Sequence, residues 1–403
     1  MALDVAKIRS SYPALSDGYA YLDGAAGTQM PVSVIEAISG AYLAGLGNVG
    51  GAFPASHRSG EIVRACRQAV ADLVGGEPEG VVLGPNMTTL TYRLADTLSR
   101  CWAHGDEVVV SRLDHDANVR PWVQAASRAG AVVRWAEVDA VTGELVTGQY
   151  DDLLSERTRL VAVTAASNLI GTRPDVAAIA RKAHEVGALT YVDGVHATPH
   201  APVDLTAFGA DFYATSSYKW SGPHVGAVIA SPALLERLHP DKLAPAPDSV
   251  PGRFERGTLP FADLAGVVAA VEHLASIDPA ATGSRRERLV ASMTTVEVYE
   301  AALFASLQSG LEEIGHVTTY GKAGLRAPTT CFNVAGMRPH DVAEHLARGG
   351  VNVWNGDNYA WELAGVFGLR DSGGAVRAGV VHYNDASDVD RLLASVAGLV
   401  ADL

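Results

Sequence analysis

The sequence predicts an α/β protein with a large domain built on a mostly parallel seven-stranded sheet, followed by a smaller α+β domain. Two observations support this fold class. From about residue 60 to 230, short β-branched apolar runs alternate with amphipathic helical segments, as in sheets whose two faces are covered by helices. Near residue 280 this alternation stops, and a long helical pattern begins.

Seven apolar runs in the first part read as strands, and the segments between several of them read as helices. In such sheets, ligands bind beyond the carboxyl ends of the strands. The expected strands are 81–83, 107–110, 131–135, 160–163, 189–192, 212–214 and 225–229, with helices at 88–99, 118–129 and 175–186.

The second part opens with a helix start signal. Ser284 and Glu287 have the spacing of a capping box, which predicts a helix over 285–313. A boundary near Gly283 divides the chain into a large domain, 19–283, and a small domain, 1–18 with 284–403. The remaining expected elements of the small domain are strands at 329–334, 351–354 and 375–381 and helices at 339–348 and 386–400.

Composition excludes several classes of protein. Net charge is 31 − 45 = −14, which disfavours nucleic-acid binding. The sequence has no run of about 18 apolar residues and no signal-peptide pattern, so we expect no membrane segment and a cytoplasmic location. Cys66, Cys101 and Cys331 are widely spaced, so neither a metal site nor a disulfide framework is expected. Cys66 and Cys331 lie in apolar patterns and are expected in the core.

Lys219 is the most informative residue. It stands in Thr215–Pro223, among aromatic and small polar residues between two expected buried strands. Burial lowers the pKa of a lysine and makes its amine nucleophilic, as Schiff-base chemistry requires. The alternative is an ordinary lysine of a surface loop.

Asp193 decides between these alternatives. It ends the strand 189–192 and precedes Gly194, twenty-six residues before Lys219. Pyridoxal phosphate (PLP) needs a carboxylate to keep its ring nitrogen protonated. A lone aspartate at a strand end is more often a cap, but the combination with Lys219 favours a PLP enzyme.

Three further segments fit such a site. Met87, Thr88 and Thr89 begin a helix, where N–H groups and hydroxyls suit a phosphate, although threonine is also a common helix cap. His115 lies between a strand and a helix, where its ring could stack on the cofactor. Asn168 ends another strand and could bind the phenolic oxygen of the cofactor. Each of the last two residues could also be an ordinary loop residue.

Together these residues resemble the class V aminotransferase family of PLP-dependent, fold type I enzymes, in its cysteine desulfurase-like branch. The resemblance runs from the segment Tyr21–Ala26 to Arg377. It implies that Lys219 forms the Schiff base with PLP, that Asp193 pairs with the ring nitrogen and that His115 stacks on the ring. His196 is implied near the phenolic oxygen, where many relatives have glutamine.

The resemblance also implies phosphate and substrate contacts. Arg377 would hold the α-carboxylate of a small amino-acid substrate, for which a guanidinium fork is well suited. The segment Arg253–Thr258 resembles one that reaches the phosphate of a partner subunit, which implies a homodimer. The implied phosphate residues are Met87, Thr88, Thr89, Ser216, Tyr218 (in place of the usual histidine), Gly257 and Thr258, and the implied substrate residues are Arg377, Asn168 and Ala26.

One segment departs from the family pattern. In desulfurases, a mobile loop before the last strands carries a cysteine that attacks the substrate sulfur, and Tyr359 stands in that place here. A phenol cannot form a persulfide, but Tyr359 could donate a proton. We therefore expect β-elimination (a C–S lyase) or a desulfurase-like reaction on a cysteine-type substrate. Aminotransfer, epimerisation and a non-catalytic PLP-fold binding protein are the alternatives, and a sulfur-acceptor protein is left open.

Overall fold

The computed structural model describes residues 3–401. Its largest sheet has seven strands in the order β2-β8-β7-β6-β5-β3-β4, and only β8 runs antiparallel to its neighbours. The expected mostly parallel seven-stranded sheet is therefore confirmed. Its strands are β2 (Val81–Gly84), β3 (Glu107–Ser111), β4 (Val132–Ala136), β5 (Thr158–Thr164), β6 (Leu189–Asp193), β7 (Phe212–Ser216) and β8 (Gly226–Ala230).

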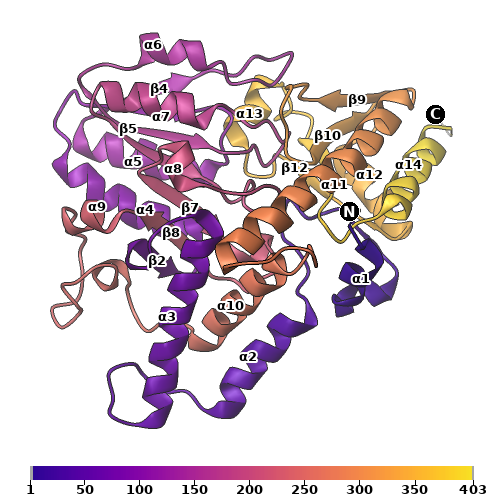
Figure 1. Ribbon diagram of the computed structural model, residues 1–403. Helices are drawn as coiled ribbons and strands as arrows, with labels where there is room; N and C mark the ends of the chain where they lie inside the picture. The colour runs from indigo at the N-terminus through magenta and orange to yellow at the C-terminus, as the bar shows by residue number, and fades with distance from the viewer. Residues whose placement is uncertain (1–2, 402–403) are drawn as a thin grey trace.

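Helices cover both faces of this sheet (Figure 1). Alternate residues of one strand enter different cores: Val161 and Val163 pack on one face, and Leu160 and Ala162 on the other. Burial on both faces explains why these strands read as continuous apolar runs. The helices of this part are α2 (Val32–Ala44), α3 (Pro54–Val74), α4 (Met87–Leu98), α5 (Arg120–Ala129), α6 (Tyr150–Leu153), α7 (Val176–Glu185), α8 (Leu205–Phe208), α9 (Pro232–Glu236) and α10 (Phe261–Ala275).

The C-terminal part has its own apolar core around a four-stranded antiparallel sheet of order β12-β13-β10-β9. Its long helix begins with the predicted capping box of Ser284 and Glu287. The elements are α11 (Arg285–Glu313), β9 (Val317–Tyr320), β10 (Thr329–Val334), α12 (Pro339–Arg348), β11 (Val351–Asn352), β12 (Trp354–Gly356), α13 (Trp361–Val366), β13 (Ala375–Gly379) and α14 (Ala386–Ala401).

The expected single strand at 351–354 is wrong. The chain forms two short strands there, and they join different sheets: β11 pairs with β1 (Ala20–Tyr21), and β12 pairs with β13. An apolar run shows that a segment is extended but does not show which neighbour it pairs with.

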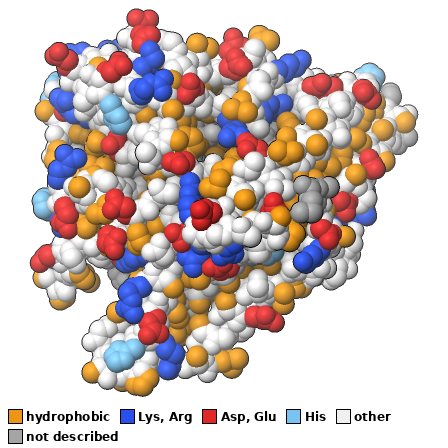
Figure 2. All heavy atoms as spheres, in the orientation of Figure 1, with side chains coloured by type: hydrophobic (Ala, Val, Ile, Leu, Met, Phe, Trp, Pro, Cys, Tyr) orange, Lys and Arg blue, Asp and Glu red, His pale blue; other side chains and the backbone are white. Residues whose placement is uncertain are grey.

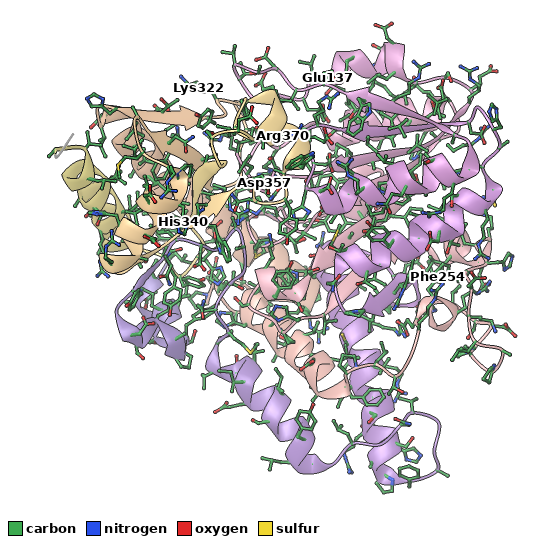
Figure 3. The ribbon with its side chains drawn as sticks, turned by 180° about the vertical axis from the view of Figure 1, so that it is seen from behind. Glu137, Phe254, Lys322, His340, Asp357 and Arg370 are labelled. Carbon is green, nitrogen blue, oxygen red and sulfur yellow. The ribbon has the colours of Figure 1, made fainter. Side chains whose placement is uncertain are left out.

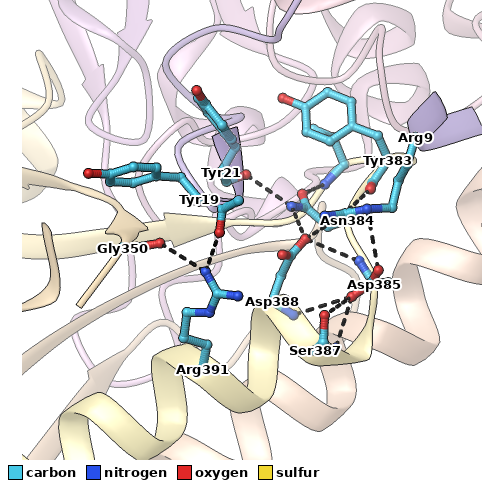
Figure 4. A network of polar contacts seen from close by, with 12 residues as sticks. Arg9, Tyr19, Tyr21, Gly350, Tyr383, Asn384, Asp385, Ser387, Asp388 and Arg391 are labelled. Atoms are coloured by element: carbon cyan, nitrogen blue, oxygen red, sulfur yellow. Dashed lines mark hydrogen bonds and ion pairs between the residues drawn. The ribbon is translucent and has the colours of Figure 1, made fainter. Parts of the chain in front are cut away.

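Charged groups connect the N-terminal segment to the C-terminal part of the chain (Figure 4). Arg9, in α1 (Val5–Ser10), donates to Asp388 Oδ2 at 2.7 Å, and Arg391 donates to the carbonyl of Gly18 at 2.5 Å. Tyr12 also contacts the large domain, since its hydroxyl lies 2.7 Å from Ser221 Oγ. The segment therefore bridges the two parts of the chain.

Among the described residues, no helix combines the length and apolar character needed to cross a membrane. Cys66 and Cys331 are buried, as expected, and Cys101 is exposed.

Candidate active site

A cleft opens at the carboxyl edge of the large sheet, where Lys219, Asp193 and His115 meet. They come from different strand ends: Asp193 ends β6, Lys219 ends the 3₁₀ turn Ser217–Lys219 after β7, and His115 follows β3. Arg377 reaches the same cleft from β13 of the small domain. The outer part of the cleft, which Lys219, His115 and Arg377 line, has a volume of about 960 Å³, near the upper end of ordinary ligand sites, about 300–1,000 Å³. Asp193 lies in its narrow inner part.

Lys219 is buried, and its Nζ donates to the carbonyl of Ala25 at 2.5 Å. Loss of water and the positive charge of Arg377 lower the pKa of this amine to about 7, against a smaller opposite effect of Asp193. A lysine with this pKa is substantially neutral near pH 7 and is therefore a nucleophile.

Asp193 is held in place by its own turn. Its Oδ1 accepts a hydrogen bond from the N–H of Val195 at 2.9 Å. Gly194 is required between them, because a Cβ there would lie 1.9 Å from Tyr213 Cζ. Burial raises the pKa of Asp193 to about 6, partly offset by Val195 and Lys219. A cationic ring nitrogen beside this carboxylate would offset its loss of water.

His115 presents a neutral ring. Its Nδ1 accepts from the N–H of Ala117 at 3.0 Å, which leaves the proton on Nε2. Burial, with the charges of Lys219 and Arg377, lowers the pKa of His115 to about 3. The ring stacks with Tyr359, with centroids 5.4 Å apart and planes at 17°.

The N-terminus of α4 lies at the same edge of the sheet. Asn86 caps it by accepting from the N–H of Thr89 at 2.8 Å, and the N–H of Met87 donates to Ser216 Oγ at 3.0 Å. The side chains of Thr88 and Thr89 border the cleft. A helix N-terminus with two hydroxyls is suited to bind a phosphate.

Arg377 and Asn168 connect the cleft to the segment of residues 354–362, which we call the lid segment. Arg377 Nη1 donates to the carbonyl of Asn168 at 2.9 Å. The side-chain amide of Asn168 in turn donates to the carbonyl of Asn358 at 2.7 Å. Burial lowers the pKa of Arg377 to about 10, so the guanidinium remains charged at neutral pH.

The lid segment is tied to the large domain at further points. The N–H of Asp116 donates to the carbonyl of Tyr359 at 2.7 Å, and Glu362 accepts from Arg120 at 2.6 Å. Asn358 and Tyr359 have φ of 52° and 58°, a left-handed conformation that costs roughly 1–2 kcal/mol per residue. These bonds offset that cost and fix the position of Tyr359. In Figure 3, Asp357 and Arg370 lie where the C-terminal part of the chain meets the part that carries the seven-stranded sheet.

Most residues predicted for the site border this cleft, and three do not. Ser216 is buried behind α4, bound to Met87, and Gly257 and Thr258 lie outside the lining. Sequence reasoning missed several lining residues, for which the local sequence offered no signal. The predicted residues in the lining are Ala26, Met87, Thr88, Thr89, His115, Asn168, Asp193, His196, Tyr218, Lys219, Tyr359 and Arg377, and the missed ones include Tyr92, Thr164, Arg120 and His224.

The residues present fit PLP. Two buried polar atoms of the lining residues, Asn168 Oδ1 and His196 Nδ1, have no partner among the described residues. Buried polar atoms normally have hydrogen-bond partners, so both call for a polar ligand or water. PLP carries a phenolic oxygen for such groups, a ring nitrogen for Asp193, a phosphate for the start of α4 and an aldehyde for Lys219.

A nucleophilic buried lysine paired with a buried aspartate at this edge of the sheet defines a PLP-dependent enzyme of fold type I. Solved structures agree. The cysteine desulfurase CsdA from Escherichia coli superimposes with a TM-score of 0.88 at 28% identity over 100% of both chains. A cysteine desulfurase from Thermococcus onnurineus does so with a TM-score of 0.90 at 26% identity, covering 100% of this chain and 99% of that one.

Sequence comparison gives the family. The profile described as aminotransferase class-V matches residues 20–392. A Pseudomonas aeruginosa protein named probable cysteine desulfurase is 33% identical over 404 residues, 95% of each chain. An uncharacterized protein of Mycobacterium tuberculosis is 39% identical over 400 residues, 99% of this chain and 100% of that one. The chain belongs to the class V aminotransferase family.

A change of pH should alter stability through Lys219. The pKa of this lysine is 10.5 unfolded and about 7 folded, so between these values the unfolded chain holds more protons. The stability contribution of Lys219 therefore rises with pH across this window, by about 1 kcal/mol per pH unit. After cofactor removal, urea unfolding of the wild type and of Lys219→Met should diverge between pH 7.5 and 9. Parallel stability curves would contradict the lowered pKa.

Proposed function

We propose that this enzyme breaks the Cβ–S bond of a cysteine-type amino acid by β-elimination, as a C–S lyase related to the desulfurases. The observation that carries this proposal is the pairing of Lys219 with Arg377 in a cleft that no thiol lines. Lysine and arginine recognise an amino acid by its amine and its carboxylate.

The position of the cysteines supports elimination over sulfur transfer. Cys331 lies beside Arg377 across the β10–β13 pair, but it is buried, and burial raises the pKa of its thiol to about 12. Cys101 follows the far end of α4, roughly 20 Å from the phosphate-facing end at 1.5 Å per residue. A thiol that is protonated or distant cannot accept sulfur from a substrate in the cleft.

Lys219 and Asp193 carry the central step in this proposal. When bound, PLP withdraws electrons from a bond at the α-carbon of the amino acid. The amine of Lys219, neutral at physiological pH, takes the α-proton, and the carboxylate of Asp193 holds the proton on the ring nitrogen. His115 covers one face of the ring and excludes water from it.

The substrate is oriented by Arg377, which binds the α-carboxylate beside Asn168 and Ala26. Tyr359 delivers a proton to the departing sulfur. The Cβ–S electron pair leaves with the sulfur, which departs as a thiol. Water then converts the released three-carbon enamine into pyruvate and ammonia, so the reaction needs no oxidant.

The phosphate is bound by Met87, Thr88 and Thr89 at the start of α4, with Tyr218 beside them, and Ser216 supports the turn through the N–H of Met87. We further propose that Gly257 and Thr258 of the partner subunit complete this site in a homodimer.

An apolar arm supports the proposed homodimer. The arm formed by α2 and α3 projects from the large domain, and Figure 2 shows apolar side chains along it. Tyr42, Leu43 and Phe53 are exposed there, as is common at subunit interfaces. Sedimentation velocity on the pure protein distinguishes a two-chain particle from a single chain.

The reaction is tested by mixing the PLP-loaded protein with cysteine, cystine, S-methylcysteine and alanine and measuring pyruvate, released thiol or sulfide, and the absorption spectrum together. We expect pyruvate and thiol in equal amounts from a cysteine-type substrate. Free PLP without protein is the control, because PLP itself reacts slowly with amino acids.

Two other results would retire the elimination proposal. A keto acid with conversion to the pyridoxamine form, and no thiol, would indicate aminotransfer, and an aminotransferase-like protein of Gibberella zeae is among the relatives, at 30% identity. Loss of optical activity without pyruvate would indicate epimerisation.

A further inference from the structure

The outer part of the cleft is lined by aromatic rings. Tyr218 and His224 stack with centroids 4.8 Å apart and planes at 14°. In the lid segment, Trp354 and Tyr359 are 53% and 72% exposed, although both border the same cleft. Tyr92 lies in the same lining. Large apolar side chains kept exposed around one cleft indicate a surface for an apolar ligand.

The position of Trp354 relative to Arg377 is fixed by strand register. The two residues are direct partners in the antiparallel β12–β13 pair, so their side chains leave the sheet on the same face, with Cβ atoms about 5 Å apart. An amino acid whose carboxylate is bound by Arg377 therefore lies beside the indole of Trp354.

The second aromatic ring, that of Tyr359, stacks on His115 in the same lining. Asn168 connects Arg377 to Asn358 through two hydrogen bonds, and Tyr359 follows directly. The ion pair of Glu362 with Arg120 anchors the end of the lid segment. Because this segment is tied at several points, its rings are already in position before a substrate enters, and little ordering cost is incurred on binding.

Free cysteine does not use this surface. Its side chain ends at the sulfur, so the rings of Trp354 and Tyr359 would stay in water beside a bound cysteine. A planar apolar group attached to the sulfur would extend past Cβ into the part of the cleft that these rings line. Aromatic rings prefer such offset or edge contacts with another flat group.

We propose that the substrate is an S-substituted cysteine whose sulfur carries a planar apolar group, received by Trp354 and Tyr359. This inference rests on the proposed β-elimination. The α-proton is removed, the Cβ–S bond breaks, and its electron pair leaves with the substituted sulfur, which takes a proton and departs as a thiol. This reaction needs no sulfur acceptor, which agrees with the absence of cysteine from the residues that line the cleft.

The test separates recognition from reaction by using ligands that have no amine. Calorimetry on the PLP-loaded protein compares 3-(benzylsulfanyl)propanoate with 3-(methylsulfanyl)propanoate. We expect the benzyl ligand to bind about tenfold more tightly, from apolar burial and ring contact. In Trp354→Ala the ratio should fall to about twofold or less. Tyr359→Phe keeps the ring and should keep the ratio. If Trp354→Ala fails to fold, Trp354→Leu, which keeps an apolar side chain but removes the indole, replaces it and should also lower the ratio.

Trp361→Ala is the matched control. Trp361 is an exposed tryptophan of the same lid segment, but it lies against Arg370 and outside the cleft lining. We expect it to keep the tenfold ratio. If it lowers the ratio as much as Trp354→Ala does, the preference comes from the general order of the lid, and the proposed contact is overturned.

Kinetics with S-benzylcysteine and S-methylcysteine complete the test. A kcat/KM about tenfold higher for the benzyl substrate, lost in Trp354→Ala, supports the inference. Equal binding of the two propanoates overturns it, whether or not pyruvate is formed. If the benzyl preference is present but no cysteine derivative yields pyruvate, the proposed elimination fails while the aromatic recognition stands.

Discussion

Replacing Lys219 with alanine is expected to remove the visible absorbance band of the PLP-loaded protein and to lower turnover by roughly 10³-fold or more. Lys219 is the amine that borders Asp193 and His115 in the cleft, so no other lysine can take its place. The variant removes both the covalent attachment of the cofactor and the base for the α-proton. Absorption spectroscopy with a pyruvate assay measures both losses.

Lys7→Ala is the control for this experiment, because Lys7 lies in α1, far along the chain and outside the cleft lining. It should keep the band and full activity. A Lys219→Ala protein that folds, keeps its visible band and turns over at the wild-type rate would refute the assignment of Lys219.

The second large effect is expected at Arg377. Arg377→Ala removes the buried cation that faces the α-carboxylate, and loss of one partner of a buried charge pair costs about 2–5 kcal/mol, or roughly 30- to 5,000-fold in affinity. KM for a cysteine substrate should rise within this range. Arg377→Lys restores the charge without the two-pronged geometry and should recover only part of the affinity.

A ligand that has an amine but no carboxylate distinguishes the loss of carboxylate binding by Arg377 from a general disturbance of the cleft. Binding of cysteamine to the PLP-loaded protein, followed by its spectral change, should differ little between the wild type and Arg377→Ala. An equal loss for cysteamine and cysteine would mean that the substitution disturbs the cleft, for instance through the lost bond to Asn168, and would contradict a carboxylate role.

Prediction from sequence succeeded where local pattern and burial agree. The strand at 329–334 and the helices at 285–313 and 339–348 have the predicted bounds. The capping box of Ser284 fixes the start of the first helix. The buried residues of β10 fix the position of the strand. The helix α2 was not predicted, because it leaves apolar side chains such as Leu43 exposed. Such a helix has no clear polar face from which to recognise it.

Parts of the site were also beyond sequence reasoning. Ser216 as a phosphate ligand stays a prediction, but the sequence did not indicate that its hydroxyl accepts a hydrogen bond from the N–H of Met87. Ala25, whose carbonyl accepts the hydrogen bond from Lys219, lies 194 positions away from it in the sequence. Neither contact follows from spacing, because each depends on how separate strand ends and turns come together.

The sequence by itself determined the α/β class, the sheet with two buried faces, and the pairing of Lys219 with Asp193 in a PLP enzyme. These follow from local periodicity and from residue types that are rarely placed together without a chemical reason. Only the tertiary structure decided that β11 and β12 join different sheets, that the lid segment is tied to the large domain, and that Trp354 stands beside Arg377. Strand register and domain contact set these positions, and both depend on pairing between distant segments, which local sequence does not specify.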